Sequence, residues 1–271
     1  MTPGTFGLRA RVLLPLLIAF AGPALADSTE RPLCPARPGL ATPPCIVDSG
    51  HVLAELGLAD WTLDRQDGDR NDTIVAGDLL LRLGLDTHSE VQIGLTTFGM
   101  SRDRIAGVVS RATGLGDMTL AFKRSLRSPD GSGFSVAVQP FVTLPTGGAA
   151  IGAGDWGAGL IVPISVALSD SVSLELTPEI DAAVDGDRKG RHVSLVAVEG
   201  LSFALSPSVS MAVEAQQVHD ADPAGIQDHA LVGLSFAWQP ARHWQLDMGG
   251  VAGLDSASPD IEFYVGISRR F

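Results

Sequence analysis

The sequence is short of cysteine, of positive charge and of long apolar runs. Its 271 residues include two cysteines, and 19 lysines and arginines stand against 31 acidic residues. The resulting net charge of −12 argues against binding nucleic acid or anionic lipid through a basic patch. Beyond the amino-terminal leader, no stretch approaches the roughly 20 apolar residues that a transmembrane helix needs. A helical membrane protein and a basic nucleic-acid-binding protein are therefore both disfavoured.

The composition is nevertheless apolar. Hydrophobic residues make up 45% of the chain and charged residues only 18%, and the mean hydropathy is positive. Apolar composition without apolar runs is typical of strands that present alternate side chains to lipid.

The amino-terminal segment has the pattern of a secretory signal peptide spanning residues 1–26. Arg9 and Arg11 form a basic region, Val12–Phe20 is a short apolar run, and Ala24-Leu25-Ala26 is a small-x-small cleavage site. A membrane anchor is the alternative, but the run is too short to span a bilayer. We therefore expect export from the cytoplasm.

Residues 27–50 form a proline-rich arm with five prolines and no periodicity. The arm holds both cysteines, Cys34 and Cys45, which are expected to form a disulfide because the periplasm is oxidising. A metal site is the alternative, but two thiols without a nearby histidine make a poor ligand set. The arm is expected either to lie in the periplasm or to fold as a plug into the barrel mouth.

From residue 51 to residue 271 the chain reads as an all-β, transmembrane, up-and-down antiparallel β-barrel of about 12 strands. Period-two runs of ten to fourteen residues alternate with turn residues. Because backbone groups in hydrocarbon must all be paired, the first run must hydrogen-bond to the last. The predicted strands are His51–Leu63, Thr73–Leu85, Glu90–Met100, Gly116–Leu126, Phe134–Leu144, Asp155–Leu168, Val172–Ala183, Val193–Leu205, Ser208–Val218, His229–Gln239, His243–Leu254 and Ile261–Phe271.

Two runs fit the alternation imperfectly. The parity of the first slips near Trp61, which falls on the polar face. In the eighth, Glu199 shares the parity of Leu195 and Leu201, and a β-bulge is expected to repair the pattern.

The connections sort by length. Those after even-numbered runs are short, and those after odd-numbered runs, such as residues 101–115, are mostly longer and more polar. This asymmetry is typical of barrels in the Gram-negative outer membrane with both termini in the periplasm.

The last strand ends on Phe271, which resembles the carboxy-terminal signature of outer-membrane barrels, although Arg269 stands where an apolar residue is preferred. An aromatic girdle is expected at the periplasmic interface. Its members are Phe122, Phe134, Phe203, Phe236, Trp238, Trp244 and Phe271.

Two short segments carry a family resemblance. Gly114–Lys123 (GLGDMTLAFK) and Leu144–Gly147 (LPTG) resemble segments of the MetA-pathway of phenol degradation family, and the resemblance runs from about Gly114 to Phe271. It implies an outer-membrane barrel associated with uptake of aromatic or hydrophobic compounds, and does not imply an enzyme.

The polar parity is expected to line the lumen. Its charged side chains suit either a selective pore or a salt-bridged, poorly conducting interior, since twelve strands enclose less space than a 16–18-strand porin. The predicted lumen-lining residues are Asp78, Arg82, Glu90, Asp117, Lys123, Glu175, Glu179, Glu214, Asp247, Glu262 and Arg270.

One pair suggests chemistry. His192 and Ser194 project from the same strand face, as in outer-membrane lipid hydrolases, but the sequence does not place an orienting acid. The leading expectation is thus a passive channel with no catalytic residue, cofactor or metal. The alternatives are a lipid hydrolase and a non-conducting structural barrel.

The expected partners are outer-membrane lipid and lipopolysaccharide, the barrel-assembly machinery and a small hydrophobic solute, with no nucleic acid. Acidic loops around Asp69, Asp185 and Asp222 are expected to be solvated, with calcium binding or bridging to lipopolysaccharide as the alternative.

Overall fold

The computed structural model describes residues 30–66, 68–148 and 151–271. Residues 31–271 form one compact unit. The predicted signal peptide, residues 1–26, lies outside the described residues. In the part of the chain that is described, no helix is long and apolar enough to cross a membrane.

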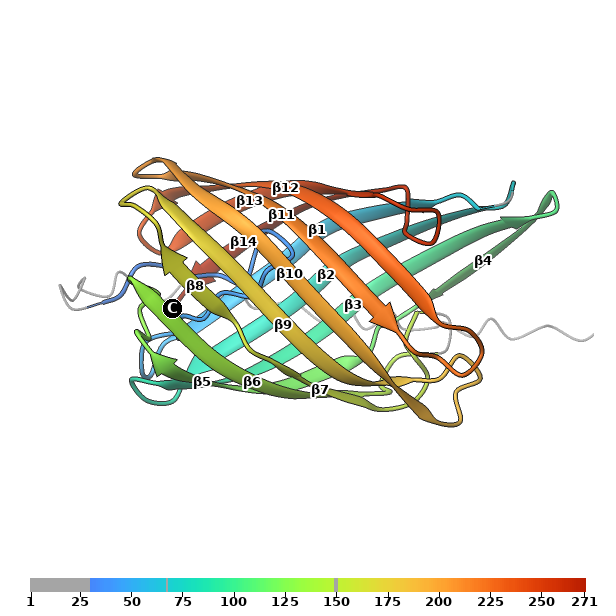
Figure 1. Ribbon diagram of the computed structural model, residues 1–271, viewed down its shortest axis with the longest axis horizontal. Coiled ribbons are helices and arrows are strands. Elements are labelled where there is room, and N and C mark those ends of the chain that lie inside the picture. Colours follow the sequence, from blue (N-terminus) through green and yellow to red (C-terminus); the bar gives the residue numbers. More distant parts are fainter. Residues whose placement is uncertain (1–29, 67, 149–150) are drawn as a thin grey trace, which may run out of the picture. The chain divides into compact units, whose positions relative to one another are not determined.

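Strands make up the regular structure of the compact unit (Figure 1). Neighbouring strands are antiparallel, β1 pairs with β14, and β9 pairs with β10, so that the sheet closes on itself. The strands are β1 (Val52–Asp64), β2 (Arg70–Gly84), β3 (Ser89–Ile105), β4 (Val108–Gly114), β5 (Met118–Arg127), β6 (Phe134–Leu144), β7 (Gly157–Ile161), β8 (Ile164–Ala167), β9 (Val172–Val184), β10 (Arg191–Ser206), β11 (Val209–Asp220), β12 (Gln227–Ala241), β13 (Trp244–Gly253) and β14 (Ile261–Arg270).

Two pairs of these strands are single barrel strands with a local interruption. β4 and β5 continue one another along β3 in an unbroken register. β7 and β8 do the same along β6 and β9, and the break falls at Pro163, which has no N–H to donate. The predicted closed barrel of twelve antiparallel strands is therefore confirmed.

The predicted loop over residues 101–115 is mostly a hairpin instead. β3 continues to Ile105, and β4 returns from Val108 after a turn in which Ala106 and Gly107 have φ of 49° and 83°. This hairpin projects beyond the neighbouring strands (Figure 1). The sequence pattern missed it because polar residues occupy both of its faces, so the apolar alternation that marked the other strands is absent.

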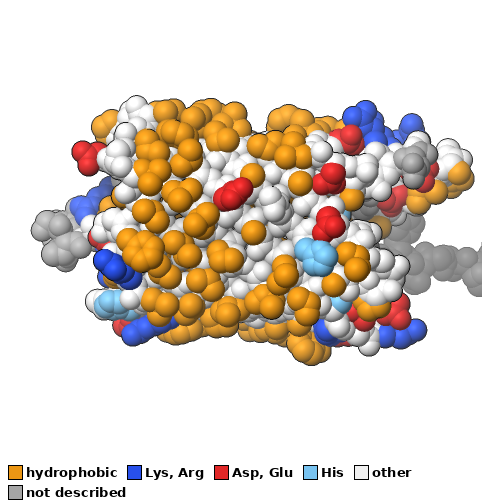
Figure 2. Space-filling view, viewed as in Figure 1, with side chains coloured by type: hydrophobic (Ala, Val, Ile, Leu, Met, Phe, Trp, Pro, Cys, Tyr) orange, Lys and Arg blue, Asp and Glu red, His pale blue; other side chains and the backbone are white. Residues whose placement is uncertain are grey.

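The outer wall of the barrel is apolar. Figure 2 shows hydrophobic side chains spread over the wall, with most charged side chains towards its two ends. Leucine, isoleucine and phenylalanine side chains at this surface, for example Leu83, Ile93 and Phe236, are more than a third exposed. So large an exposed apolar surface is expected for a wall that contacts lipid.

A β-bulge in β1 corrects the assignment of Trp61 to the polar face. The pairing of β1 with β14 shifts register between Gly57 and Ala59, which reverses the parity of the residues that follow. Trp61 therefore stacks against Phe263 of β14, with ring centroids 6.3 Å apart.

The bulge expected near Glu199 is absent. β10 keeps its register with both β9 and β11 through this position, where Glu199 lies opposite Leu176 and Ala215. Glu199 is exposed on the same face as Leu195 and Leu201. A carboxylate therefore lies on the lipid-facing side of the wall, near the middle of its strand.

The carboxy-terminal strand seals the barrel. Phe271 donates its N–H to the Val52 carbonyl at 2.8 Å, and Val52 donates back to the Phe271 carbonyl at 3.2 Å. The guanidinium of Arg269 lies 4.5 Å from the ring centroids of both Trp244 and Phe271. Cation–π contact with two aromatic rings gives a physical reason for an arginine at this outward position.

Candidate functional site

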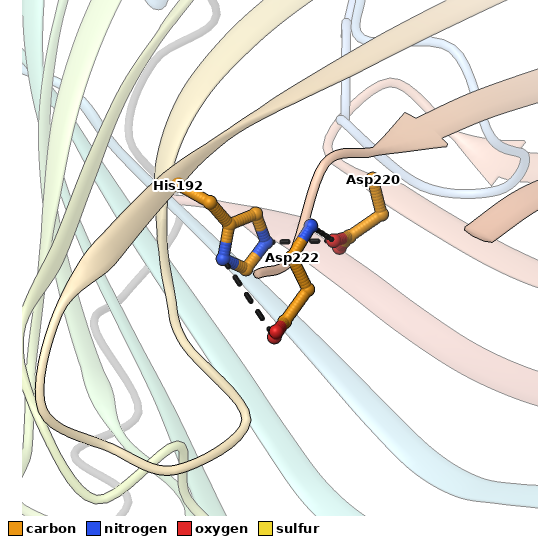
Figure 3. Close-up of side chains that lie close together, drawn as sticks. All are labelled: His192, Asp220 and Asp222. Atoms are coloured by element: carbon orange, nitrogen blue, oxygen red, sulfur yellow. Dashed lines mark hydrogen bonds and ion pairs between the residues drawn. The ribbon is translucent and has the colours of Figure 1, made fainter. Parts of the chain in front are cut away.

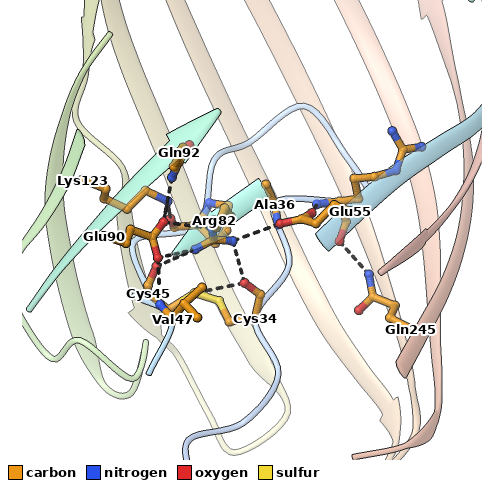
Figure 4. Close-up of polar contacts among 12 residues, drawn as sticks. Cys34, Ala36, Cys45, Val47, Glu55, Arg82, Glu90, Gln92, Lys123 and Gln245 are labelled. Atoms are coloured by element: carbon orange, nitrogen blue, oxygen red, sulfur yellow. Dashed lines mark hydrogen bonds and ion pairs between the residues drawn. A yellow bond between two sulfur atoms is a disulfide. The ribbon is translucent and has the colours of Figure 1, made fainter. Parts of the chain in front are cut away.

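The arm packs against inward-facing side chains of the barrel. Figure 4 shows its backbone between the strands, with polar side chains of the wall directed towards it. Cys34 and Cys45 form a disulfide that closes the central part of the arm into a loop. These contacts are those of a segment held inside the lumen.

Two glutamates hold the arm through its backbone. The carboxylate of Glu55 on β1 accepts hydrogen bonds from the N–H groups of Ala36 and Arg37, each at 3.0 Å. The carboxylate of Glu214 on β11 accepts from Leu40 at 2.9 Å and from Ala41 at 2.8 Å. Carboxylates that accept N–H groups in a confined site make stronger hydrogen bonds than neutral acceptors do, so these contacts fix the position of the arm.

A buried charge cluster lies beside the disulfide. Arg82 donates to Glu90 through Nε at 2.8 Å and to Glu55 through Nη1 at 3.2 Å, and all three side chains have no exposed surface. The Lys123 ammonium lies 3.9 Å from Glu90 and donates to the Pro43 carbonyl at 2.9 Å. Charges so buried need partners on every side, and here the arm supplies part of them.

The disulfide places arm carbonyls where Arg82 reaches them. Arg82 donates to the carbonyl of Cys34 at 2.8 Å and to that of Cys45 at 3.1 Å, while Glu90 accepts the Val47 N–H at 2.7 Å. Strands β2 and β3 therefore contact backbone groups of the disulfide loop, so these contacts depend on the conformation of the loop as well as on the charges of Arg82 and Glu90.

Most of the other predicted lumen residues also face the arm or the open lumen. Asp247 pairs with Arg37 at 3.2 Å, and Arg270 donates to the Arg31 carbonyl at 2.8 Å. Asp78 accepts from Thr96 at 2.8 Å. Glu175, Glu179 and Glu262 lie on the inward parity of β9 and β14.

Asp117 has a different place from the one expected. It lies just before β5, and its carboxylate accepts the N–H groups of Gly147 at 2.9 Å and Ala153 at 2.7 Å. It thus anchors the loop between β6 and β7. The GLGD and LPTG segments are in contact here, and a Cβ on Gly147 would lie 2.6 Å from the Leu115 carbonyl oxygen, which explains the glycine.

Glu55 is absent from the predicted lumen residues, although it is central to the site. Glu55 shares its parity with Leu53 and Gly57. The first run therefore has apolar residues on both faces, and its parity slips near Trp61, so the alternation did not mark the face of Glu55 as the lumen face. An isolated glutamate in an apolar strand was the available signal.

Two cavities lie beside the arm. The first, about 230 Å³, is bordered by arm residues such as Arg37 and by Glu175, Glu214 and Gln245. The second, about 240 Å³, lies against Leu80, Phe141 and Ile161 together with Gln92, Gln139 and Lys123. The space beside the arm is therefore narrow and partly apolar.

His192 and Ser194 lie on the inward face of β10, but His192 contacts aspartates. Its Nδ1 hydrogen-bonds Asp185 at 3.0 Å, and its Nε2 lies 2.7 Å from Asp220. Among the contacts of the described residues, neither nitrogen approaches Ser194. The geometry that would activate a serine nucleophile is not formed.

A family model described as "Putative MetA-pathway of phenol degradation" matches residues 36–271. The match extends well before Gly114, where the resemblance was expected to begin, and includes Cys45 and most of the residues of the arm that contact the wall. No curated protein matches the chain.

Several solved outer-membrane barrels share the fold. The COG4313 outer membrane channel from Pseudomonas putida F1 is 15% identical, with a TM-score of 0.63 over 91% of this chain and 100% of that one. The NanC porin is 6% identical, with a TM-score of 0.51 over 80% and 98%. The β domain of the Bordetella autotransporter BrkA is 13% identical, with a TM-score of 0.51 over 83% and 100%.

Proposed function

The chain belongs to the MetA-pathway of phenol degradation family, and on that premise we propose that it is an outer-membrane channel for passive uptake of small hydrophobic or aromatic compounds. The observation that carries the proposal is the narrow, partly apolar space between the arm and the wall. The similarity in fold of this chain to an outer-membrane channel and to a porin supports the same role.

The lining of the second cavity suits an amphipathic solute. Leu80, Phe141 and Ile161 offer apolar contact, while the side chains of Gln92 and Gln139 offer hydrogen bonds to a hydroxyl or carboxyl group. A small phenol-like molecule presents both kinds of surface. The arm limits the width, so large hydrated solutes are excluded and small flat ones pass.

In this proposal the protein catalyses no reaction. The barrel lies in the outer membrane with both termini in the periplasm, so the arm restricts the periplasmic half of the lumen. The apolar wall contacts lipid and lipopolysaccharide, and insertion requires the barrel-assembly machinery.

Flux into liposomes tests the proposal. Vesicles with the purified barrel are compared with empty vesicles in a swelling assay, using sugars, amino acids, and aromatic and aliphatic carboxylates of similar size. The proposal expects small aromatic solutes to enter faster than sugars. Flux no greater than in empty vesicles contradicts it.

A matched pair of variants tests whether solutes pass through the second cavity. Ala121 borders the second cavity, whereas the adjacent Leu120 lies on the exposed outer face. Ala121→Trp is expected to abolish aromatic flux, and Leu120→Trp to preserve it. Equal flux through both variants would exclude this route.

A further inference from the structure

Aspartates surround His192 at the barrel end that carries the long loops. His192 lies at the start of β10, Asp220 ends the neighbouring strand β11, and Asp222 follows in the loop to β12 (Figure 3). The His192 side chain is only 5% exposed, although it lies at the edge of the lumen. Ligand atoms from these three residues lie within 4.8 Å of one another. Asp220 lies 2.7 Å from Nε2, and Asp222 lies 3.8 Å from Nδ1.

The hydrogen bonding of His192 fixes which nitrogen is available. A carboxylate only accepts hydrogen bonds, so the 3.0 Å contact of Nδ1 with the Asp185 carboxylate places a proton on Nδ1. In a neutral imidazole, Nε2 then carries a lone pair. Nε2 is buried and has no hydrogen-bond partner of acceptable direction, although an Asp220 oxygen lies 2.7 Å away.

This arrangement calls for positive charge, which either a second ring proton or a bound metal ion supplies. A buried lone pair facing a carboxylate oxygen is repulsive unless positive charge lies between or on them. Lys189 and Arg191, two of the three cations in the adjoining loop and strand, pair with other aspartates. Lys189 lies 3.9 Å from Asp187, and Arg191 pairs with Asp155 at 3.0 Å while its guanidinium lies over the Trp156 ring.

We propose that His192, Asp220 and Asp222 bind a divalent transition-metal ion of the zinc class. One imidazole nitrogen with carboxylate oxygens suits zinc, cobalt or nickel better than calcium or magnesium, which prefer all-oxygen sites. Asp185 accepts the Nδ1 proton and so orients the ring for metal binding through Nε2, as carboxylates commonly do for metal-bound histidines. To admit an ion with bonds of about 2.0 to 2.2 Å, Nε2 and the Asp220 oxygen need to separate to about 3.3 Å. The Asp222 carboxylate, which lies 3.8 Å from Nδ1, has to turn towards Nε2.

Such an ion joins two loops over the lumen edge. Asp222 already accepts the N–H of Gly186 at 2.6 Å, which ties the β11–β12 loop to the β9–β10 loop. Metal binding to His192 and Asp220 reinforces the same connection. The site therefore stabilises the loops at the end of the channel opposite the arm.

Titration of the chelator-treated barrel in detergent with Zn²⁺, Ni²⁺, Co²⁺ and Ca²⁺ tests the proposal. It expects one Zn²⁺ per barrel, and a Co²⁺ absorption spectrum with imidazole in the coordination sphere. His192→Ala and Asp220→Asn should each weaken Zn²⁺ binding roughly ten-fold or more.

The chain offers its own control. His219 and Asp228 form a similar pair, 2.7 Å apart, but both are largely exposed. His219→Ala should bind Zn²⁺ as the unmodified chain does, and heat-modifiable migration on gels verifies that each variant is folded. Absence of stoichiometric Zn²⁺ binding, equal binding by His192→Ala, or binding of Ca²⁺ alone overturns the proposal.

Discussion

Arg82 donates its Nε–H to Glu90 at 2.8 Å, and neither side chain has any exposed surface. The two residues lie opposite the disulfide loop of the arm, whose carbonyls accept one hydrogen bond from each of the two Arg82 Nη atoms. The buried charges of the barrel interior therefore have their full set of hydrogen-bond partners only when the arm is in place.

Replacing Arg82 should strongly destabilise the barrel. Arg82→Met leaves Glu55 and Glu90 buried without their main counter-charge, and breaking a buried pair in this way costs about 3 to 5 kcal/mol. The free energy of unfolding, measured by urea titration with the folded fraction read from heat-modifiable migration, should fall accordingly.

An exposed arginine provides the comparison. Arg124 lies 3.4 Å from Asp86, and both side chains are about half exposed. Arg124→Met should change the free energy of unfolding by less than about 1 kcal/mol, because exposed ion pairs contribute little. Similar losses of unfolding free energy in the two variants would show that the buried pairs of Arg82 contribute no more to stability than an exposed ion pair.

Removing the lipid-facing carboxylate should stabilise the protein. Glu199→Leu replaces an exposed acidic side chain near the middle of β10 with an apolar one, and we expect a gain of about 1 to 2 kcal/mol in urea unfolding in lipid vesicles. Glu179→Leu on the inward face of β9 should give no such gain. A loss of stability in Glu199→Leu would indicate that this carboxylate has a partner on the outer wall.

Opening the disulfide should loosen the arm and leave the wall intact. Cys34→Ser with Cys45→Ser removes a constraint worth about 3 kcal/mol for a loop of this size on the chain-entropy model. Amide hydrogen exchange should accelerate at Leu40, Ala41 and Val47. Unchanged exchange at these amides would show that wall contacts alone hold the arm.

The loop between β13 and β14 should respond to acid through Asp255. Burial raises the pKa of this carboxyl, but hydrogen bonds from Ser258 and from the N–H groups of Ala257 and Ala230 outweigh it and leave the pKa below its usual 3.8. A lowered pKa stabilises the folded loop above pH 3.8, and that stabilisation is lost as pH falls through the folded-state pKa.

Amide chemical shifts measure the lowered pKa of Asp255 directly. The Ala257 and Ser258 amide resonances should titrate together with a midpoint below that of a free aspartate, and Asp255→Asn should abolish the titration. A midpoint above 3.8 would show that burial outweighs the hydrogen bonds.

The wall could be predicted from the sequence because lipid imposes a strict alternation on each strand. Residues such as Leu81 and Leu83 therefore reveal their face without knowledge of the fold. The alternation is absent from segments that do not contact lipid, which is why the sequence predicts a loop where the β3–β4 hairpin lies. It also misplaces Trp61, since a single inserted residue reverses the parity beyond it.

The interior was less predictable. Arg82, Glu90 and Glu214 could be assigned to the polar parity, but their contacts with Cys34, Val47 and Ala41 depend on how the arm folds, and an arm without periodicity gives no such signal. The proximity of His192 to Asp220 and Asp222 arises from the register between β10 and β11 together with loop conformation, neither of which the alternation specifies.

The arm is held by Glu55 and Glu214, and single-channel conductance in planar bilayers tests its role as the restriction in the lumen most directly. Glu55→Ala with Glu214→Ala removes the acceptors for four arm N–H groups, whereas Glu179→Ala removes a carboxylate of the inward face of β9. We predict a several-fold higher conductance in the double variant and little change in Glu179→Ala. A double variant that conducts no better than the unmodified chain would contradict the account.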